Sequence, residues 1–138
     1  MSEIDSLFFI CILNYFTSKD VERLCSEIRN TLSNVKICIV DNSCDSTEKE
    51  SIQAISEKYN CELIISKSNA GYFKGNHLAI EKYYNKFNYC LILNPDVGCY
   101  NWEEVSATLI KTIKTNENIF SVGPKITVPN SHLVSSPL

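Results

Sequence analysis

Four short apolar runs, separated by segments with helical spacing, constrain this 138-residue chain more than any other feature. The runs cover residues 7–15, 35–42, 61–66 and 89–93, and each is apolar almost throughout rather than at every second position. Continuous apolar runs are typical of strands in a parallel sheet that is covered by helices on both faces. A further run at 119–126 predicts a fifth strand.

The segments between these runs predict helices. In residues 18–32 the apolar positions fall on one helical face, and further helices are expected at 45–59, 68–87 and 101–115. The third of these helices carries Phe73, His77, Ile80 and Tyr84 on one side. Strands that alternate with helices predict an α/β fold, with a Rossmann-like three-layer α/β/α arrangement around a mostly parallel sheet. We expect one domain over residues 1–138.

The charge balance argues against polyanionic partners. The chain has 13 basic and 16 acidic residues, a net charge of −3, so it offers no basic field to nucleic acid. Its first residues are acidic, unlike a signal peptide, and its longest apolar run, Leu7 to Leu13, is too short to span a bilayer. We expect a soluble cytoplasmic protein, with a peripheral position at the inner membrane face as the alternative.

Seven cysteines are scattered along the chain without any CxxC pair. Most lie within the apolar runs, which favours small buried hydrophobic side chains in a reducing compartment. Zinc ligation and a disulfide framework are the weaker alternatives.

Polar residues follow each of the first four predicted strands. The four groups are Asn14-Tyr15, Asp41-Asn42-Ser43, Asn69-Ala70-Gly71 and Asn94-Pro95-Asp96. Each group alone is ordinary turn chemistry. Because the carboxyl ends of parallel strands share one edge of the sheet, where open α/β sheets bind ligands, four in succession predict a site.

The residues at this edge narrow the chemistry. The chain has neither the glycine pattern of a dinucleotide site after its first strand nor a P-loop. The edge carries two acidic residues instead. Asp41 could accept hydrogen bonds from a base or ribose, and Asp96, stiffened by Pro95, could ligate Mg²⁺ or Mn²⁺, which take oxygen ligands. Together they suggest a nucleoside diphosphate that is bound with a metal.

Four segments resemble the family 2 glycosyltransferases, which are inverting enzymes with the GT-A fold. They are "ILNYF", "IVDNSCDS", "NAGYFKGNH" and "LILNPDV", and they occur in the order and spacing of that family. The resemblance is closest to the rhamnosyltransferase-like branch, which has Asn-Pro-Asp where other members carry Asp-x-Asp. It spans roughly residues 7–128, and only the last two segments taken together are fairly specific.

The resemblance implies a nucleotide-sugar site in which Asp96 ligates the divalent metal, Mn²⁺ or Mg²⁺, with Asn94 beside it. Asn14 and Tyr15 would line the nucleotide pocket, and Asp41 would contact the base. The residues implied near the sugar and diphosphate are Asn69, Gly71, Gly75 and Asn76.

This chain departs from the family pattern at several of these positions. Phe16 stands where members often have Asn, and Cys44 takes a Ser place. Asp45 is better explained as the cap of the second helix, in a capping box with Glu48. Lys74 fits a phosphate ligand and a solvated surface lysine equally well.

The largest departure is length, since family enzymes continue with a half that supplies the acceptor contacts and the general base. Glu103, Glu104 and Glu117 are the only acidic residues after Asp96, and none resembles that base. We therefore expect a donor-binding portion that transfers little sugar alone to a saccharide or lipid-linked acceptor, in cell-surface polysaccharide synthesis. The alternative is a non-catalytic nucleotide-sugar-binding or interaction module that self-associates or binds a partner chain. A nucleotidyltransferase is less favoured, because "NYFTSKD" lacks a glycine-rich basic loop.

Overall fold

The computed structural model describes residues 4–127. A short 3-10 helix, η1 (Ile4–Ser6), precedes four strands and four α-helices. The strands are β1 (Phe8–Asn14), β2 (Lys36–Asp41), β3 (Glu62–Ile65) and β4 (Tyr89–Leu93). The helices are α1 (Ser18–Thr31), α2 (Ser46–Lys58), α3 (Gly71–Tyr83) and α4 (Trp102–Ile113). Within residues 4–127, no helix combines the length and the apolar character needed to cross a bilayer.

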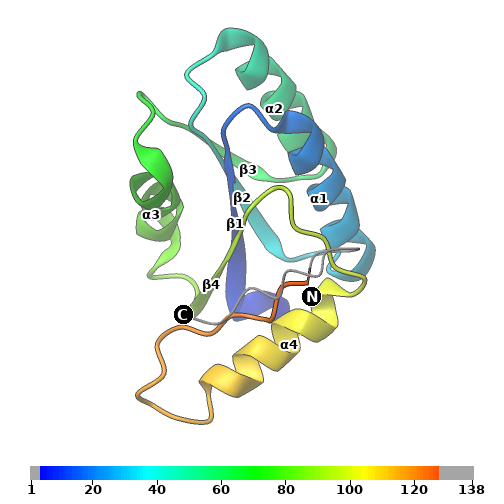
Figure 1. Ribbon diagram of the computed structural model, residues 1–138, viewed down its shortest axis with the longest axis vertical. Coiled ribbons are helices and arrows are strands. Elements are labelled where there is room, and N and C mark those ends of the chain that lie inside the picture. Colours follow the sequence, from blue (N-terminus) through cyan, green and yellow to red (C-terminus); the bar gives the residue numbers. More distant parts are fainter. Residues whose placement is uncertain (1–3, 128–138) are drawn as a thin grey trace.

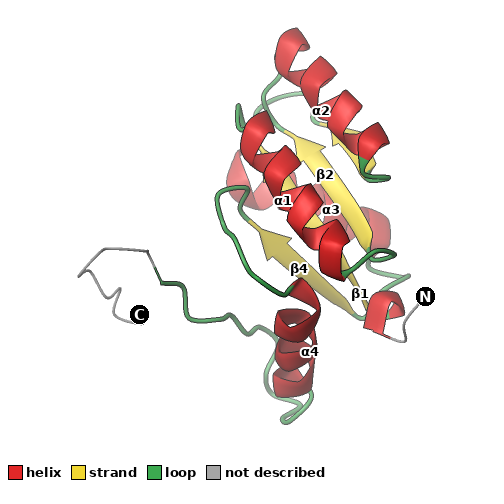
Figure 2. Ribbon diagram, turned by 90° about the vertical axis from the view of Figure 1, so that its right-hand side faces the viewer, coloured by secondary structure: helices red, strands yellow, loops and turns green. Residues whose placement is uncertain are grey.

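The four strands form one parallel sheet in the order β3-β2-β1-β4, as the continuous apolar runs predict. Asn14 at the end of β1 pairs with Asp41 at the end of β2, and Leu93 at the end of β4 pairs with Ile12. All the strand ends therefore lie at one edge of the sheet, and Figure 2 shows the arrows of β2 and β4 pointing the same way.

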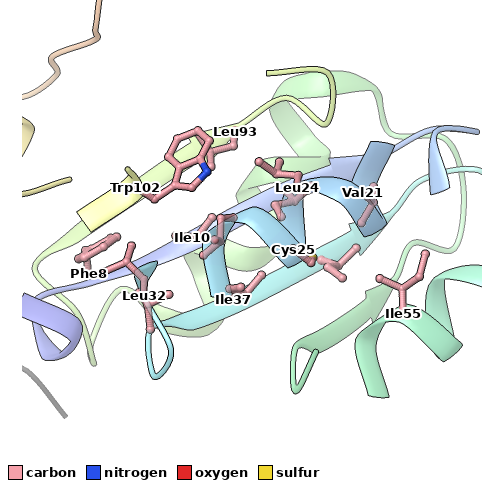
Figure 3. Close-up of a cluster of buried hydrophobic side chains, with 14 of the residues drawn as sticks. Phe8, Ile10, Val21, Leu24, Cys25, Leu32, Ile37, Ile55, Leu93 and Trp102 are labelled. Carbon is pink, nitrogen blue, oxygen red and sulfur yellow. The ribbon is translucent and has the colours of Figure 1, made fainter. Parts of the chain in front are cut away.

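Helices cover both faces of the sheet, which confirms the three-layer α/β fold. α3 lies on one face and α1, α2 and α4 lie on the other (Figure 1). Alternate strand residues serve the two sides, because successive side chains of a strand point to opposite faces. Ile10 and Ile37 pack with α1, α2 and Trp102 (Figure 3), whereas Phe9 and Cys11 pack with α3.

The orientation of α3 places mostly small residues against the sheet. Its buried residues are Gly75, Asn76, Ala79 and Tyr83. Phe73 and Tyr84, on another side of the helix, are 85% and 65% exposed. The close approach of α3 to the sheet favours small residues at the contact. Tyr83, the one large residue among them, packs against Phe9 with 5.1 Å between the ring centroids.

The predicted fifth strand is wrong. Residues 119–126 are irregular, and Phe120 and Ile126 are 94% and 66% exposed. A strand needs a hydrogen-bonding neighbour, and Pro124 within this run has no N–H to donate. In the part of the chain that is described, β4 is consequently an outer strand of the sheet.

Candidate functional site

The loops after β1 and β2 are joined by a buried network of polar side chains. Asn14 and Asp41 are 0% and 1% exposed, and Asn14 Nδ2 donates to Asp41 Oδ1 at 2.9 Å. Asp41 also accepts from the backbone N–H of Ser43 at 3.1 Å and from its hydroxyl at 3.0 Å. Asn14 Oδ1 accepts from the N–H and hydroxyl of Thr17. Both predicted site residues are thus at the expected edge, but their polar atoms already bond within the protein.

Glu48 extends this network to a third element. Asp45 caps α2 as expected, accepting from the N–H of Glu48 at 2.8 Å. The Glu48 carboxylate does not close the capping box. It accepts from the N–H of Ser18 at 2.9 Å and from Asn14 Nδ2 at 3.1 Å. Since Thr17 makes no side-chain cap bond, a carboxylate from α2 caps the N-terminus of α1 and holds Asn14 in place.

The start of α3 is fastened to the same edge by Asn42, which belongs to the polar group after β2 but has no individual role predicted from the sequence. Its Nδ2 donates to Asn69 Oδ1 at 2.9 Å, and its Oδ1 accepts from the N–H of Ala70 at 3.1 Å. Asn69 Oδ1 also accepts from the N–H of Gly71. Gly71 has φ +75°, a conformation that glycine adopts without strain, so the predicted glycine here is required by the turn.

Two other predicted site residues of α3 serve packing. A Cβ on Gly75 would lie 2.6 Å from Leu13 Cδ1, so glycine lets α3 approach β1. Asn76 is 3% exposed, donates to the carbonyl of Tyr72 and accepts a bond from the Cys11 thiol at 3.2 Å. Their side-chain positions face the sheet, so these two residues shape the start of α3 by packing. Lys74, by contrast, is exposed.

Two pairs of exposed aromatic rings stand on the elements that meet at this edge. Tyr15 and Phe16 follow β1 and contact each other edge to face at 5.0 Å, and Tyr72 and Phe73 do the same at 5.7 Å in the first turn of α3. Phe16 has φ +56°, the left-handed region that non-glycine residues seldom adopt. This conformation explains why Asn, which tolerates it, suits the position in the family that the sequence resembles.

The loop after β4 differs from the other three. The N–H of Val97 donates to the carbonyl of Asn94 at 3.3 Å, closing a turn that has Pro95 and Asp96 at its centre. Arg23 of α1 donates from Nη2 to the carbonyls of Pro95 and Val97, both at 2.9 Å. Asn94 and Asp96 are exposed, and no ion pair within residues 4–127 includes Asp96.

The side-chain oxygens at this loop suit a divalent cation that is held mainly by the phosphate oxygens of a bound nucleotide. Among the described residues, no three His, Cys, Asp or Glu side chains are grouped to hold a metal. Mg²⁺ and Mn²⁺ do not need such a group when one or two protein carboxylates are combined with phosphate oxygens and water. The exposed carboxylate of Asp96 and the side-chain oxygen of Asn94 are of the right type for this arrangement.

The cysteines lie mostly in the interior, as expected for small apolar side chains. All seven are free, and only Cys44 is exposed. Burial raises the pKa of Cys38 and of Cys90 to about 12. A hydrogen bond from Cys25, whose sulfur lies 3.9 Å away, lowers the pKa of Cys61.

No protein-family profile matches the chain, and no curated protein matches it in sequence. Solved structures do match it. S. aureus TarS 1–349 in complex with UDP superposes with a TM-score of 0.63 and 15% identity, over 78% of this chain and 33% of TarS 1–349. The complex of TarS 1–349 with UDP-GlcNAc gives a TM-score of 0.62 over 78% of this chain and 32% of that one.

TarS is a glycosyltransferase. The chain described here has a glycosyltransferase fold. The match covers 78% of this chain. It covers about a third of TarS 1–349 and 20% of the longer TarS structure. At 15% identity it establishes the fold of a glycosyltransferase domain and no finer class.

Proposed function

We propose that this chain binds a nucleotide-diphosphate sugar at the carboxyl edge of its sheet, as the donor-binding portion of an inverting, family 2-like glycosyltransferase. The glycosyltransferase fold supports this, as does the presence of UDP and UDP-GlcNAc in the similar TarS structures. The single observation that carries the proposal is the position of Asp96. It is an exposed carboxylate on a proline turn, without an ion-pair partner in residues 4–127, at the edge where three other loops gather their polar groups.

In this proposal the exposed side chains contact the donor and the buried ones shape the pocket. The rings of Tyr15 and Phe16 offer apolar faces to a base. Lys74, in the first turns of α3, offers a cation to the diphosphate, and the turn at Asn69 to Gly71 presents the backbone beside it. Asp41 is 1% exposed and already accepts bonds from Asn14 and Ser43, so it contacts the base only if these loops move apart.

Asp96 and Asn94 hold the divalent cation in this proposal, Mn²⁺ or Mg²⁺. When bound, such a cation neutralises the charge that develops on a leaving nucleoside diphosphate. In this chain, Pro95 and the turn that is closed at Asn94 set the direction of the Asp96 carboxylate. Direct displacement at the sugar also needs a base beside the acceptor hydroxyl. We propose that the base and the saccharide or lipid-linked acceptor contacts come from outside this chain.

A non-catalytic binding or interaction module is the second candidate. The open edge of β4 and the exposed rings of Phe73, Tyr100 and Phe120 favour it, because apolar groups and unpaired strand edges attract partners. Sedimentation over a range of concentrations separates the candidates. Self-association without any nucleotide binding would favour the module.

Calorimetric titration with UDP, with and without Mn²⁺, tests the proposal. We expect weak binding that Mn²⁺ strengthens, and Asp96→Ala should abolish the gain from Mn²⁺ while leaving metal-free binding unchanged. Glu117→Ala is the matched control, because it also removes an exposed carboxylate from a turn. Equal gains from Mn²⁺ in the wild type and in Asp96→Ala would refute the assigned role of Asp96.

A further inference from the structure

Arg23 lies outside the four predicted loops, yet it donates hydrogen bonds to the turn that contains Asp96. It lies on the α1 side of the sheet, in the part of the helix that faces the β4–α4 loop. Its Nη2 donates 2.9 Å bonds to two carbonyls, those of the residues immediately before and after Asp96. A guanidinium is planar and permanently charged, so bonds to two acceptors fix the acceptors relative to each other.

The rest of the Arg23 side chain is also fixed. Its Nη1 pairs with Glu27 Oε1 at 2.6 Å, one helical turn further along α1. A Cβ placed on Gly98 would lie 3.5 Å from Arg23 Nη1 and 3.7 Å from Glu27 Oε2, so the loop packs closely on this pair. Because Glu27 offsets the charge of Arg23, the guanidinium holds the loop, and the Asp96 carboxylate takes part in no ion pair within residues 4–127.

We propose that Arg23 is the positioning residue for the metal-binding carboxylate of Asp96, which it aims by holding the carbonyls on both sides. This inference rests on the proposed function. Asp96 is at the centre of a turn closed by one 3.3 Å bond, and Arg23 supplies the bonds that tie this turn to a helix. Residues that orient a metal ligand in this way change metal affinity by about 10–100-fold when they are removed.

The same helix provides a matched control. Arg29 also donates to backbone carbonyls, those of Val35, Tyr59 and Asn60, at 2.8, 2.8 and 3.0 Å. These carbonyls lie before β2 and β3, at the opposite edge of the sheet from Asp96. Arg29→Met therefore removes at least as many carbonyl bonds from α1 as the two that Arg23→Met removes, without touching the Asp96 turn.

UDP titrations with and without Mn²⁺ on the full chain compare Arg23→Met, Arg23→Lys and Arg29→Met. We expect Arg23→Met to weaken UDP binding in Mn²⁺ by about tenfold or more and to leave metal-free binding unchanged. Arg23→Lys should lie between it and the wild type, and it serves as the test if Arg23→Met does not fold. Arg29→Met should keep the full gain from Mn²⁺. A full gain in both Arg23 variants would overturn the proposal.

Hydrogen exchange at residues 96–98, measured without any ligand, separates this inference from the proposed function. Faster exchange there in Arg23→Met, but not in Arg29→Met, is expected. If the wild type gains nothing from Mn²⁺, the metal role of Asp96 fails, and exchange alone then decides whether Arg23 positions the turn. Unchanged exchange in both Arg23 variants would show that it does not.

Discussion

The loops after β1 and β2 and the loop after β4 lie at the same sheet edge, yet they are built in opposite ways. In the first pair, Asn14, Asp41 and Ser43 are buried and bonded to one another. In the third loop, Asp96 is exposed, and only the backbone around it is held. Two aspartates that look equivalent in the sequence therefore have different tasks. The Asp41 carboxylate already accepts hydrogen bonds and shapes the edge, whereas the exposed Asp96 carboxylate is available to a ligand.

Removing the buried carboxylate should have the largest effect on stability. Asp41→Ala leaves one N–H of the Asn14 amide and two donors of Ser43 without their acceptor, and we expect a loss of about 3 kcal/mol in the free energy of unfolding. Urea unfolding measures this. Asp96→Ala should change the same quantity by less than about 0.5 kcal/mol. Equal losses in the two variants would break the comparison.

Glu48 should follow in size. Glu48→Ala removes the acceptor for the N–H of Ser18 and one partner of Asn14, so we expect a loss of about 1–2 kcal/mol. Glu50→Ala, an exposed change on the same helix, is the control and should be close to neutral. A neutral Glu48→Ala would mean that the network ends at Asn14 and that α1 needs no cap from α2.

Phe16 gives the smallest of these stability effects, with the opposite sign. Phe16→Asn should raise the free energy of unfolding by about 1 kcal/mol, because Asn tolerates the left-handed backbone at φ +56° better. Phe73→Asn is the control. It removes an even more exposed ring from a regular helix and should destabilise slightly. If the ring of Phe16 contacts the donor, Phe16→Asn will also weaken UDP binding.

Much of this fold could be predicted from the sequence because the signals were local. Solid apolar runs marked β1 to β4, and Asp45 marked the start of α2. The run at 119–126 failed because a strand also needs a neighbour, which a local pattern does not report. The buried side of α3 could not be read from its large rings, because a close helix–sheet contact selects small residues such as Gly75.

The candidate site was predictable in position but not in detail. Turn residues after each strand located the edge, and the strand pairing brings Asn14 and Asp41 together. The contacts that hold these loops were not predictable, because Glu48 reaches Asn14, and Arg23 reaches the turn around Asp96, across long stretches of chain. Arg23 is separated from Pro95 by 72 positions, and a surface arginine on a helix carries no signal of its contacts.

The binding of Mn²⁺ together with UDP, located by anomalous scattering in crystals of this chain, tests the central claim most directly. We predict one manganese peak within coordination distance of the Asp96 carboxylate, with the diphosphate of UDP on its other side. A manganese peak remote from Asp96, or UDP bound away from the carboxyl edge of the sheet, would contradict the account.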